Sequence, residues 1–236
     1  MEPTVGLILP PGNRPLPPEA LSLYPQGIRF LVECLGLERM TPEGYEGVIH
    51  KIVPAAERLK AAGAQAIGIM GTSLTFYKGV AFNKFLSDSV TAATGLPSTT
   101  MSTAVVEGLN KFHARKVAVA AAYAEEVNEL LRKFLEESGF TVLNLEGLGF
   151  QKIGQAGTVA QQDLLDFSAQ VWQKAAGAEA LVVSCGGFRT LEIIEPLEQR
   201  CGVPVISSMP HAVWALVQLL GLARPVNGYG RLLAEL

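Results

Sequence analysis

Short apolar runs alternate along the chain with longer stretches in which apolar residues recur every three or four positions. The short runs are typical of buried strands, and the longer spacing is typical of amphipathic helices. Strands are predicted at residues 5–9, 66–70, 98–101, 116–121, 140–144, 181–183 and 205–207. Helices are predicted at 47–62, 81–93, 125–137 and 159–175, and Pro54 is expected to kink or restart the first. This alternation indicates parallel sheets covered on both faces by helices.

The two halves of the chain carry similar motifs in the same order. Ala62-Gly-Ala-Gln-Ala-Ile-Gly-Ile-Met-Gly-Thr-Ser73 aligns without gaps with Ala176-Gly-Ala-Glu-Ala-Leu-Val-Val-Ser-Cys-Gly-Gly187, and Gly95-Leu-Pro97 resembles Gly202-Val-Pro204. One such match alone would be a common helix-to-strand turn, but two in the same order indicate a duplication. We therefore predict an α/β fold of two pseudo-symmetric lobes, each a parallel sheet flanked by helices. Residues 1–113 plus 212–236 are expected to form the N-terminal lobe, and residues 114–211 the C-terminal lobe.

The alignment of the two halves also predicts where a ligand binds. It places Cys185 opposite Gly71, and each of these residues lies just beyond a predicted strand. In parallel α/β sheets, ligands bind beyond the carboxyl ends of the strands. We therefore expect the two loops to face each other across one cleft between the lobes.

Composition and charge exclude several classes of protein. Apolar residues make up 49% and charged residues 17% of the 236 positions, which is typical of a globular chain. The formal net charge of −3 offers no footprint for nucleic acid or an anionic membrane surface. The sequence has no signal-peptide pattern at its start and no apolar stretch of membrane-spanning length. We expect a monomeric, cytoplasmic enzyme that acts on a small molecule.

The cysteines give no sign of a disulfide framework or a zinc site. Cys34, Cys185 and Cys201 lie far apart, and their number is odd. Paired Cys-x-x-Cys and His-Glu-x-x-His spacings are absent from the sequence, and its three histidines show no partner spacing. We expect no metal site, and we expect the histidines to be ordinary surface or core residues.

Cys185 is the strongest candidate for chemistry. It lies in Ser184-Cys-Gly-Gly187, where glycines after a strand let backbone N–H groups approach an anion closely. An ordinary thiol has a pKa of about 8.5, so a thiol at this position can give or take a proton near neutral pH. The alternative is a small buried apolar residue, which fits Cys34 and Cys201 better because they lie in apolar-periodic segments.

Hydroxyl groups and prolines lie near the other predicted strand ends. Thr72 and Ser73, in the loop opposite Cys185, could hold a carboxylate and the extra charge of an enediolate, or could cap the following helix. Tyr123 follows the strand at 116–121, where its phenol could donate to the same carboxylate or pack at a domain surface. Pro10 and Pro11 end the first strand and would form an apolar wall.

Taken together, Met70-Gly-Thr-Ser-Leu74 and Ser184-Cys-Gly-Gly187 resemble the arylmalonate decarboxylase family of the aspartate/glutamate racemase superfamily. The similarity extends nearly end to end through Leu9-Pro-Pro11, Thr41-Pro-Glu-Gly-Tyr45, Thr99-Thr-Met-Ser-Thr103, Ala122-Tyr123, Val127-Asn-Glu129 and Gly228-Tyr-Gly-Arg231. Racemases and maleate isomerases of this superfamily carry a cysteine in both loops, whereas the decarboxylases keep only the second. With Gly71 opposite Cys185, the chain has the one-cysteine arrangement.

The resemblance implies a carboxy-lyase that needs no cofactor. Such an enzyme converts α-aryl or alkenyl malonates into enantioenriched α-aryl carboxylic acids, through an enediolate that Cys185 would protonate. One carboxylate of this small-molecule dicarboxylate would be held by polar groups, and the other would face an apolar pocket. The implied polar residues are Thr72, Ser73, Tyr123 and the backbone of Cys185, Gly186 and Gly187; the implied apolar residues are Pro10, Leu37, Met40, Leu74 and Ile153; Gly71, Pro11 and Tyr45 complete the implied site.

Two other functions stay open. A racemase or isomerase of the same superfamily, of the amino-acid, hydantoin or maleate type, needs acid/base groups on both faces of its substrate. The absence of a second loop cysteine counts against it, unless Thr72 or Ser73 relays the proton. The other alternative is a carboxylate-binding module without turnover.

Overall fold

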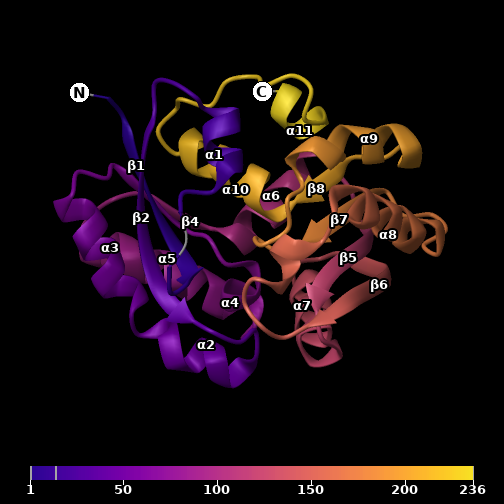
Figure 1. Cartoon of the computed structure of the whole chain (residues 1–236), viewed down its shortest axis with the longest axis horizontal. Helices are drawn as coiled ribbons and strands as arrows, with labels where there is room; N and C mark the ends of the chain where they lie inside the picture. The colour runs from indigo at the N-terminus through magenta and orange to yellow at the C-terminus, as the bar shows by residue number, and fades with distance from the viewer. Residues whose placement is uncertain (1, 14, 236) are drawn as a thin grey trace.

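Two four-stranded sheets form the framework of the protein. The computed structural model describes residues 2–13 and 15–235 and sets the two halves side by side (Figure 1). The first sheet contains β1 (Thr4–Pro11), β2 (Arg29–Leu37), β3 (Ala66–Ile69) and β4 (Ser98–Thr100), and the second contains β5 (Lys116–Tyr123), β6 (Thr141–Phe150), β7 (Ala180–Ser184) and β8 (Val205–Ser207). The strand orders are β2-β1-β3-β4 and β6-β5-β7-β8. All neighbouring strands in these sheets are parallel.

Helices connect the strands and cover the sheets. The first half contains α1 (Pro18–Leu23), α2 (Pro42–Ile49), α3 (Ile52–Ala61), α4 (Thr72–Phe76), α5 (Val80–Thr94) and α6 (Met101–Lys111). They are followed by α7 (Glu125–Glu137), a 3₁₀ turn at Gln155–Thr158, α8 (Gln161–Gln173), α9 (Leu191–Cys201), α10 (Ser208–Gln218) and α11 (Arg231–Ala234). Within the described ranges, none of these helices has both the length and the apolar character that crossing a membrane requires.

The predicted duplication is confirmed, because the two sheets have the same strand order and the repeated motifs form the same turns. Gly95 ends α5 and Gly202 ends α9 in left-handed backbone conformations with φ of 71° and 73°. Gly63 and Gly177, just before β3 and β7, also have positive φ values, of 99° and 87°. Glycine adopts this conformation without the steric cost that other residues incur. The repeated glycines therefore form corresponding turns in both halves.

The exact lobe boundaries stay a prediction. Met1 and Leu236, which the predicted N-terminal lobe includes, lie outside the described residues, as does Arg14. Beyond the last strand of the second sheet, α10 returns to the first half and packs on α6, α1 and β3 (Figure 1). Every residue from Ser208 to Val217 is buried. Burial of α10 therefore ties the end of the second half to the first.

The histidines are ordinary surface and core residues, as predicted. His50 and His113 are exposed, whereas His211 on α10 is completely buried. Burial lowers the pKa of the His211 imidazole to about 4, so the ring is neutral at physiological pH. Its Nδ1 atom accepts a hydrogen bond of 2.7 Å from the backbone N–H of Ser207.

Several predicted boundaries were wrong. The predicted helix at 47–62 begins earlier, at Pro42, and is two helices, α2 and α3. The restart expected at Pro54 is confirmed, because Pro54 lies in the first turn of α3, where its missing N–H breaks no helical bond. β1 continues through Pro10 to Pro11 instead of ending at Leu9, and the β1–β2 register shifts at this point. Thr72 and Ser73 begin α4 instead of lying in a loop. The sequence patterns also missed α1, β2, α6, α9, α10 and α11.

Phe76 connects the two halves through aromatic packing. This residue of α4 is completely buried. Its ring centroid lies 5.7 Å from that of Tyr123, at the end of β5, and 6.2 Å from that of Phe134 on α7. Because α4 carries Thr72 and Ser73 in its first turn, this packing also holds these two residues against the second half.

Replacing Phe76→Ala is expected to lower the free energy of unfolding by about 3–5 kcal/mol, because the cavity left between the halves cannot close fully. Urea denaturation followed by circular dichroism measures this change. Phe85→Ala is the matched control, because Phe85 is 61% exposed and its loss should change the free energy by no more than about 0.5 kcal/mol. Equal losses for the two variants would contradict the assigned packing.

Candidate active site

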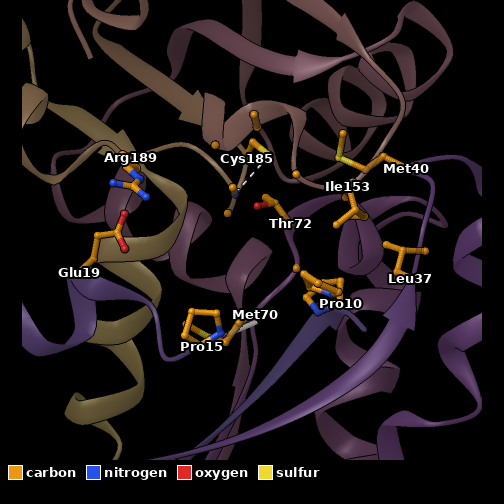
Figure 2. A pocket seen from close by; sticks show the side chains of 18 of the residues that line it. Pro10, Pro15, Glu19, Leu37, Met40, Met70, Thr72, Ile153, Cys185 and Arg189 are labelled. Atoms are coloured by element: carbon orange, nitrogen blue, oxygen red, sulfur yellow. Dashed lines mark hydrogen bonds between the residues drawn. The ribbon is translucent and has the colours of Figure 1, made fainter. Parts of the chain in front are cut away.

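A cavity of about 350 Å³ lies at the carboxyl ends of β1, β3, β5 and β7. Residues of both halves line it, as predicted, because the strand ends of the two parallel sheets meet there. Its volume lies within the range of about 300–1,000 Å³ that is usual for small-molecule sites. Figure 2 shows Cys185 and Thr72 on its wall, with Pro10 below them.

Most of the predicted site residues line this cavity. They are Pro10, Pro11, Leu37, Met40, Gly71, Thr72, Ser73, Tyr123, Ile153, Cys185, Gly186 and Gly187. Tyr45 and Leu74 are not among the lining residues, and both side chains are completely buried. Tyr45 lies against Ser73, and Leu74 lies beside Gly71, so both support the wall from behind. The roles assigned to all these residues stay predictions at this point.

Cys185 follows β7 directly and is held by hydrogen bonds on both sides. Its side chain lines the cavity although the residue is only 6% exposed. Its backbone N–H donates to Ser208 Oγ at 3.1 Å. The backbone N–H of Gly187 donates to Cys185 Sγ, with the nitrogen and sulfur 3.4 Å apart. An N–H dipole therefore points at the sulfur, where it would stabilise negative charge.

Close packing explains the two glycines after Cys185. A Cβ atom at Gly186 would lie 3.1 Å from Sδ of Met101, and one at Gly187 would lie 3.1 Å from Cβ of Ala156. Both distances are shorter than an ordinary van der Waals contact. The glycines therefore keep side chains out of the space next to the sulfur.

Gly71 and Thr72, at the carboxyl end of β3, also line the cavity. A Cβ atom at Gly71 would overlap Cγ of Pro10, so a larger residue would displace this proline. The Thr72 hydroxyl lies 2.9 Å from Met101 Sδ and 3.0 Å from Ser208 Oγ. Ser208 thus contacts both the Thr72 side chain and the Cys185 backbone, and the sequence patterns gave no sign of this role.

The two tyrosines near the site are hydrogen-bond donors over a wide pH range. Tyr123 is 1% exposed, and its phenol oxygen lies 3.4 Å from Ser184 Oγ. Burial raises the pKa of Tyr123 well above its usual value, and contacts with Ser184 and Thr72 offset this only in part. Burial likewise raises the pKa of Tyr45, which the Ser73 hydroxyl partly opposes. Both phenols therefore stay neutral and protonated at neutral and moderately alkaline pH.

The cavity has an apolar side and a charged side. Figure 2 shows Leu37, Met40 and Ile153 together on one side, and Glu19 and Arg189 on the other. Glu19 is 4% exposed on α1, whereas Arg189 is exposed at the end of the loop that begins at Cys185.

Ten other described residues line the cavity and were not assigned to the site individually from the sequence: Asn13, Pro15, Leu16, Pro18, Glu19, Met70, Gly154, Ala156, Gly157 and Arg189. Met70 belongs to the first recognised motif and Arg189 lies two residues beyond the second, so both could have been found from them. Many of the others belong to α1 and the segment before it, or to the 3₁₀ turn, for which the sequence gave no clear pattern. Within the described ranges, no three His, Cys, Asp or Glu side chains gather as ligands of a metal ion would.

Comparisons with known proteins agree on one family. The family model for arylmalonate decarboxylase matches residues 5–233. Arylmalonate decarboxylase from Bordetella bronchiseptica is 43% identical over 236 residues, covering 99% of this chain and 97% of that relative. A solved structure of arylmalonate decarboxylase in a liganded form, with one Gly-to-Cys and one Cys-to-Ser exchange, has a TM-score of 0.95 at 41% identity and covers 98% of both chains. A maleate cis-trans isomerase from Nocardia farcinica has a TM-score of 0.91 at 21% identity over 98% of both chains, which shows a shared fold.

The structural match extends to the spacing of the two facing loops. The glycine and cysteine exchanged in the liganded decarboxylase variant are as many positions apart in that chain as Gly71 and Cys185 are here. The predicted enzyme class, a decarboxylase, is confirmed by the whole-chain relative and the family model together. Because the match covers almost every residue and includes both loops of the cavity, the chain belongs to the arylmalonate decarboxylase family.

Proposed function

We propose that the protein decarboxylates α-aryl or alkenyl malonates to enantioenriched α-aryl carboxylic acids, without a cofactor, and that Cys185 protonates the enediolate intermediate. The observation that carries this proposal is the single thiol on the cavity wall, opposite a glycine in the matching loop of the other half. The similarity to arylmalonate decarboxylase from Bordetella bronchiseptica supports the substrate class. The cavity of about 350 Å³ suits a malonate with one aromatic ring.

One carboxylate of the substrate would bind at the polar wall. Thr72, Ser73 and Tyr123 present hydroxyl groups there, and the raised pKa of Tyr123 keeps its phenol a donor. Donors fixed before the reaction stabilise charge that develops in the transition state without having to reorganise. The retained carboxylate becomes an enediolate during the reaction, so these contacts would strengthen as the barrier is crossed.

The other carboxylate would face the apolar side formed by Leu37, Met40 and Ile153. A carboxylate loses favourable hydration in such surroundings, whereas neutral CO₂ loses little. The bond between the α-carbon and this carboxylate then breaks, and its electron pair stays on the α-carbon. The aryl group and the retained carboxylate share that charge.

Proton transfer from Cys185 completes the reaction. The thiol gives its proton to the α-carbon, and the new C–H bond takes up the electron pair left by CO₂. The sulfur is left as a thiolate, which the N–H of Gly187 is placed to stabilise at 3.4 Å. A proton from water then restores the thiol.

The facing residue Gly71 supports decarboxylation over racemisation. A racemase needs a second acid/base group on the opposite face of its substrate, and a glycine has none. Pro10 also occupies the space that a side chain at this position would need. No acid/base side chain therefore replaces the missing cysteine at that position.

Replacing Cys185→Ala is expected to lower kcat for phenylmalonate by about 10²–10⁴-fold, because the general acid is lost. KM should change little, because the carboxylate donors remain. Release of CO₂ and uptake of protons measure the rate. Cys34→Ala and Cys201→Ala are matched controls on β2 and α9, remote in sequence from both loops, and should keep wild-type rates.

A wild-type protein that binds α-aryl malonates but releases no CO₂ would instead be the carboxylate-binding module, and the proposal would fail.

Replacing Tyr123→Phe is expected to lower kcat/KM by about 10²-fold, because one donor to the enediolate is lost. The raised pKa of Tyr123 means that the phenol stays protonated beyond pH 10. Its titration therefore cannot cause a loss of activity between pH 7 and about 9. Measured pH profiles of kcat/KM should have their alkaline limb at the same pH in both proteins. Loss of that limb in the variant would show that Tyr123 itself titrates there.

A further inference from the structure

Ser208 joins the two loops that face each other across the cavity. It is the first residue of α10 and is completely buried. Its Oγ atom accepts the backbone N–H of Cys185 at 3.1 Å and lies 3.0 Å from the Thr72 hydroxyl. Ser208 does not line the cavity, so any effect it has on bound substrate must act through these two neighbours.

The Thr72 hydroxyl has more neighbours than it has protons. Met101 Sδ at 2.9 Å and Ser208 Oγ at 3.0 Å are both within reach of its single proton. The Tyr123 phenol also contacts Thr72, and in the proposed function this phenol donates to the carboxylate itself. When that proton is donated to a substrate carboxylate, neither neighbour receives it, and Thr72 Oγ1 can accept a hydrogen bond. A methionine sulfur has no proton to give, whereas the Ser208 hydroxyl does.

We propose that Ser208 is a positioning residue that donates its hydroxyl proton to Thr72 Oγ1 when a carboxylate binds, which rests on the proposed function. The result is a chain of hydrogen bonds in one direction, from the Cys185 N–H to Ser208, then to Thr72, then to the carboxylate. Each bond in such a chain polarises the next. The last bond therefore strengthens as charge accumulates on the enediolate.

The pseudo-symmetry of the fold shows why a serine at this position matters. Met101 begins α6 after β4, just as Ser208 begins α10 after β8. The two residues occupy equivalent places in the halves and both contact Thr72. Only the serine can both accept from the Cys185 backbone and donate to Thr72. Ser208 thus couples the loop that carries the acid to the loop that holds the carboxylate.

A double-mutant cycle with Thr72 tests this coupling. Ser208→Ala is expected to lower kcat for phenylmalonate about tenfold, as expected for one hydrogen bond, with KM changed by less than about twofold. In a Thr72→Val background the chain is already broken, so adding Ser208→Ala should cost less than about threefold. Ser208→Cys, with a similar size and a weaker donor, should fall between wild type and Ser208→Ala.

Ser168→Ala is the matched control for loss of a buried hydroxyl. Ser168 on α8 is completely buried, and its hydroxyl makes no hydrogen bond within the described residues. This variant should keep wild-type kcat, and melting temperatures of all variants show whether they fold. Equal losses from Ser208→Ala in both backgrounds, or a wild-type kcat for Ser208→Ala, would overturn the inference.

Calorimetry can measure the same double-mutant cycle on the affinity for phenylacetate instead of on kcat. This second measurement separates the role of Ser208 from the proposed function. If the wild type releases no CO₂ but the two substitutions are coupled in phenylacetate binding, the proposed function fails and the role of Ser208 holds. If the wild type is active and the substitutions are additive in both rate and affinity, only the role of Ser208 fails.

Discussion

Burial of α10 against the first half of the chain holds the two loops of the cavity together. This helix leaves the last strand of the second sheet and packs on α6, α1 and β3. Its first residue, Ser208, bonds to the Cys185 backbone from one half and to Thr72 from the other. The position of the thiol relative to the hydroxyl groups therefore depends on how the two halves pack, and not on either loop alone.

Duplication of the sheets places two equivalent loops on one cavity, and the proposed chemistry depends on a difference between these loops. Cys185 carries a sulfur where Gly71 carries only hydrogen, and Pro10 fills the space beside Gly71. On the remaining walls, hydroxyl groups lie together near Thr72, and aliphatic side chains lie around Leu37. A malonate bound as proposed would meet donors at one carboxylate, an apolar surface at the other and Cys185 as its proton source.

The sequence predicted the duplicated sheets because its glycine turns recur in both halves, and such turns have few conformational alternatives. It did not predict β2, an edge strand that is mostly half-buried and whose apolar residues do not alternate with polar ones. Pro10 was wrongly expected to end β1, because a proline usually breaks strand pairing, whereas here a shift in register accommodates it.

The motifs identified most of the cavity wall among the described residues, as well as Tyr45 and Leu74 behind it, but not Ser208 or Arg189. Tyr45 and Leu74 support the wall without lining it, and Ser208 acts through backbone and hydroxyl contacts that no local pattern encodes. Arg189 belongs to an exposed loop end, which apolar periodicity does not describe. The expected monomeric state and cytoplasmic location stay predictions.

Decarboxylation of α-methyl-α-phenylmalonate in deuterated water tests most directly whether one thiol delivers the proton from one face. Chiral chromatography and mass spectrometry of the product give its configuration and its deuterium content. If Cys185 alone delivers the proton, the product is one dominant enantiomer with a single deuterium at the α-carbon. Equal amounts of the two enantiomers from an active enzyme would show that the proton arrives from both faces, and would contradict this role of Cys185.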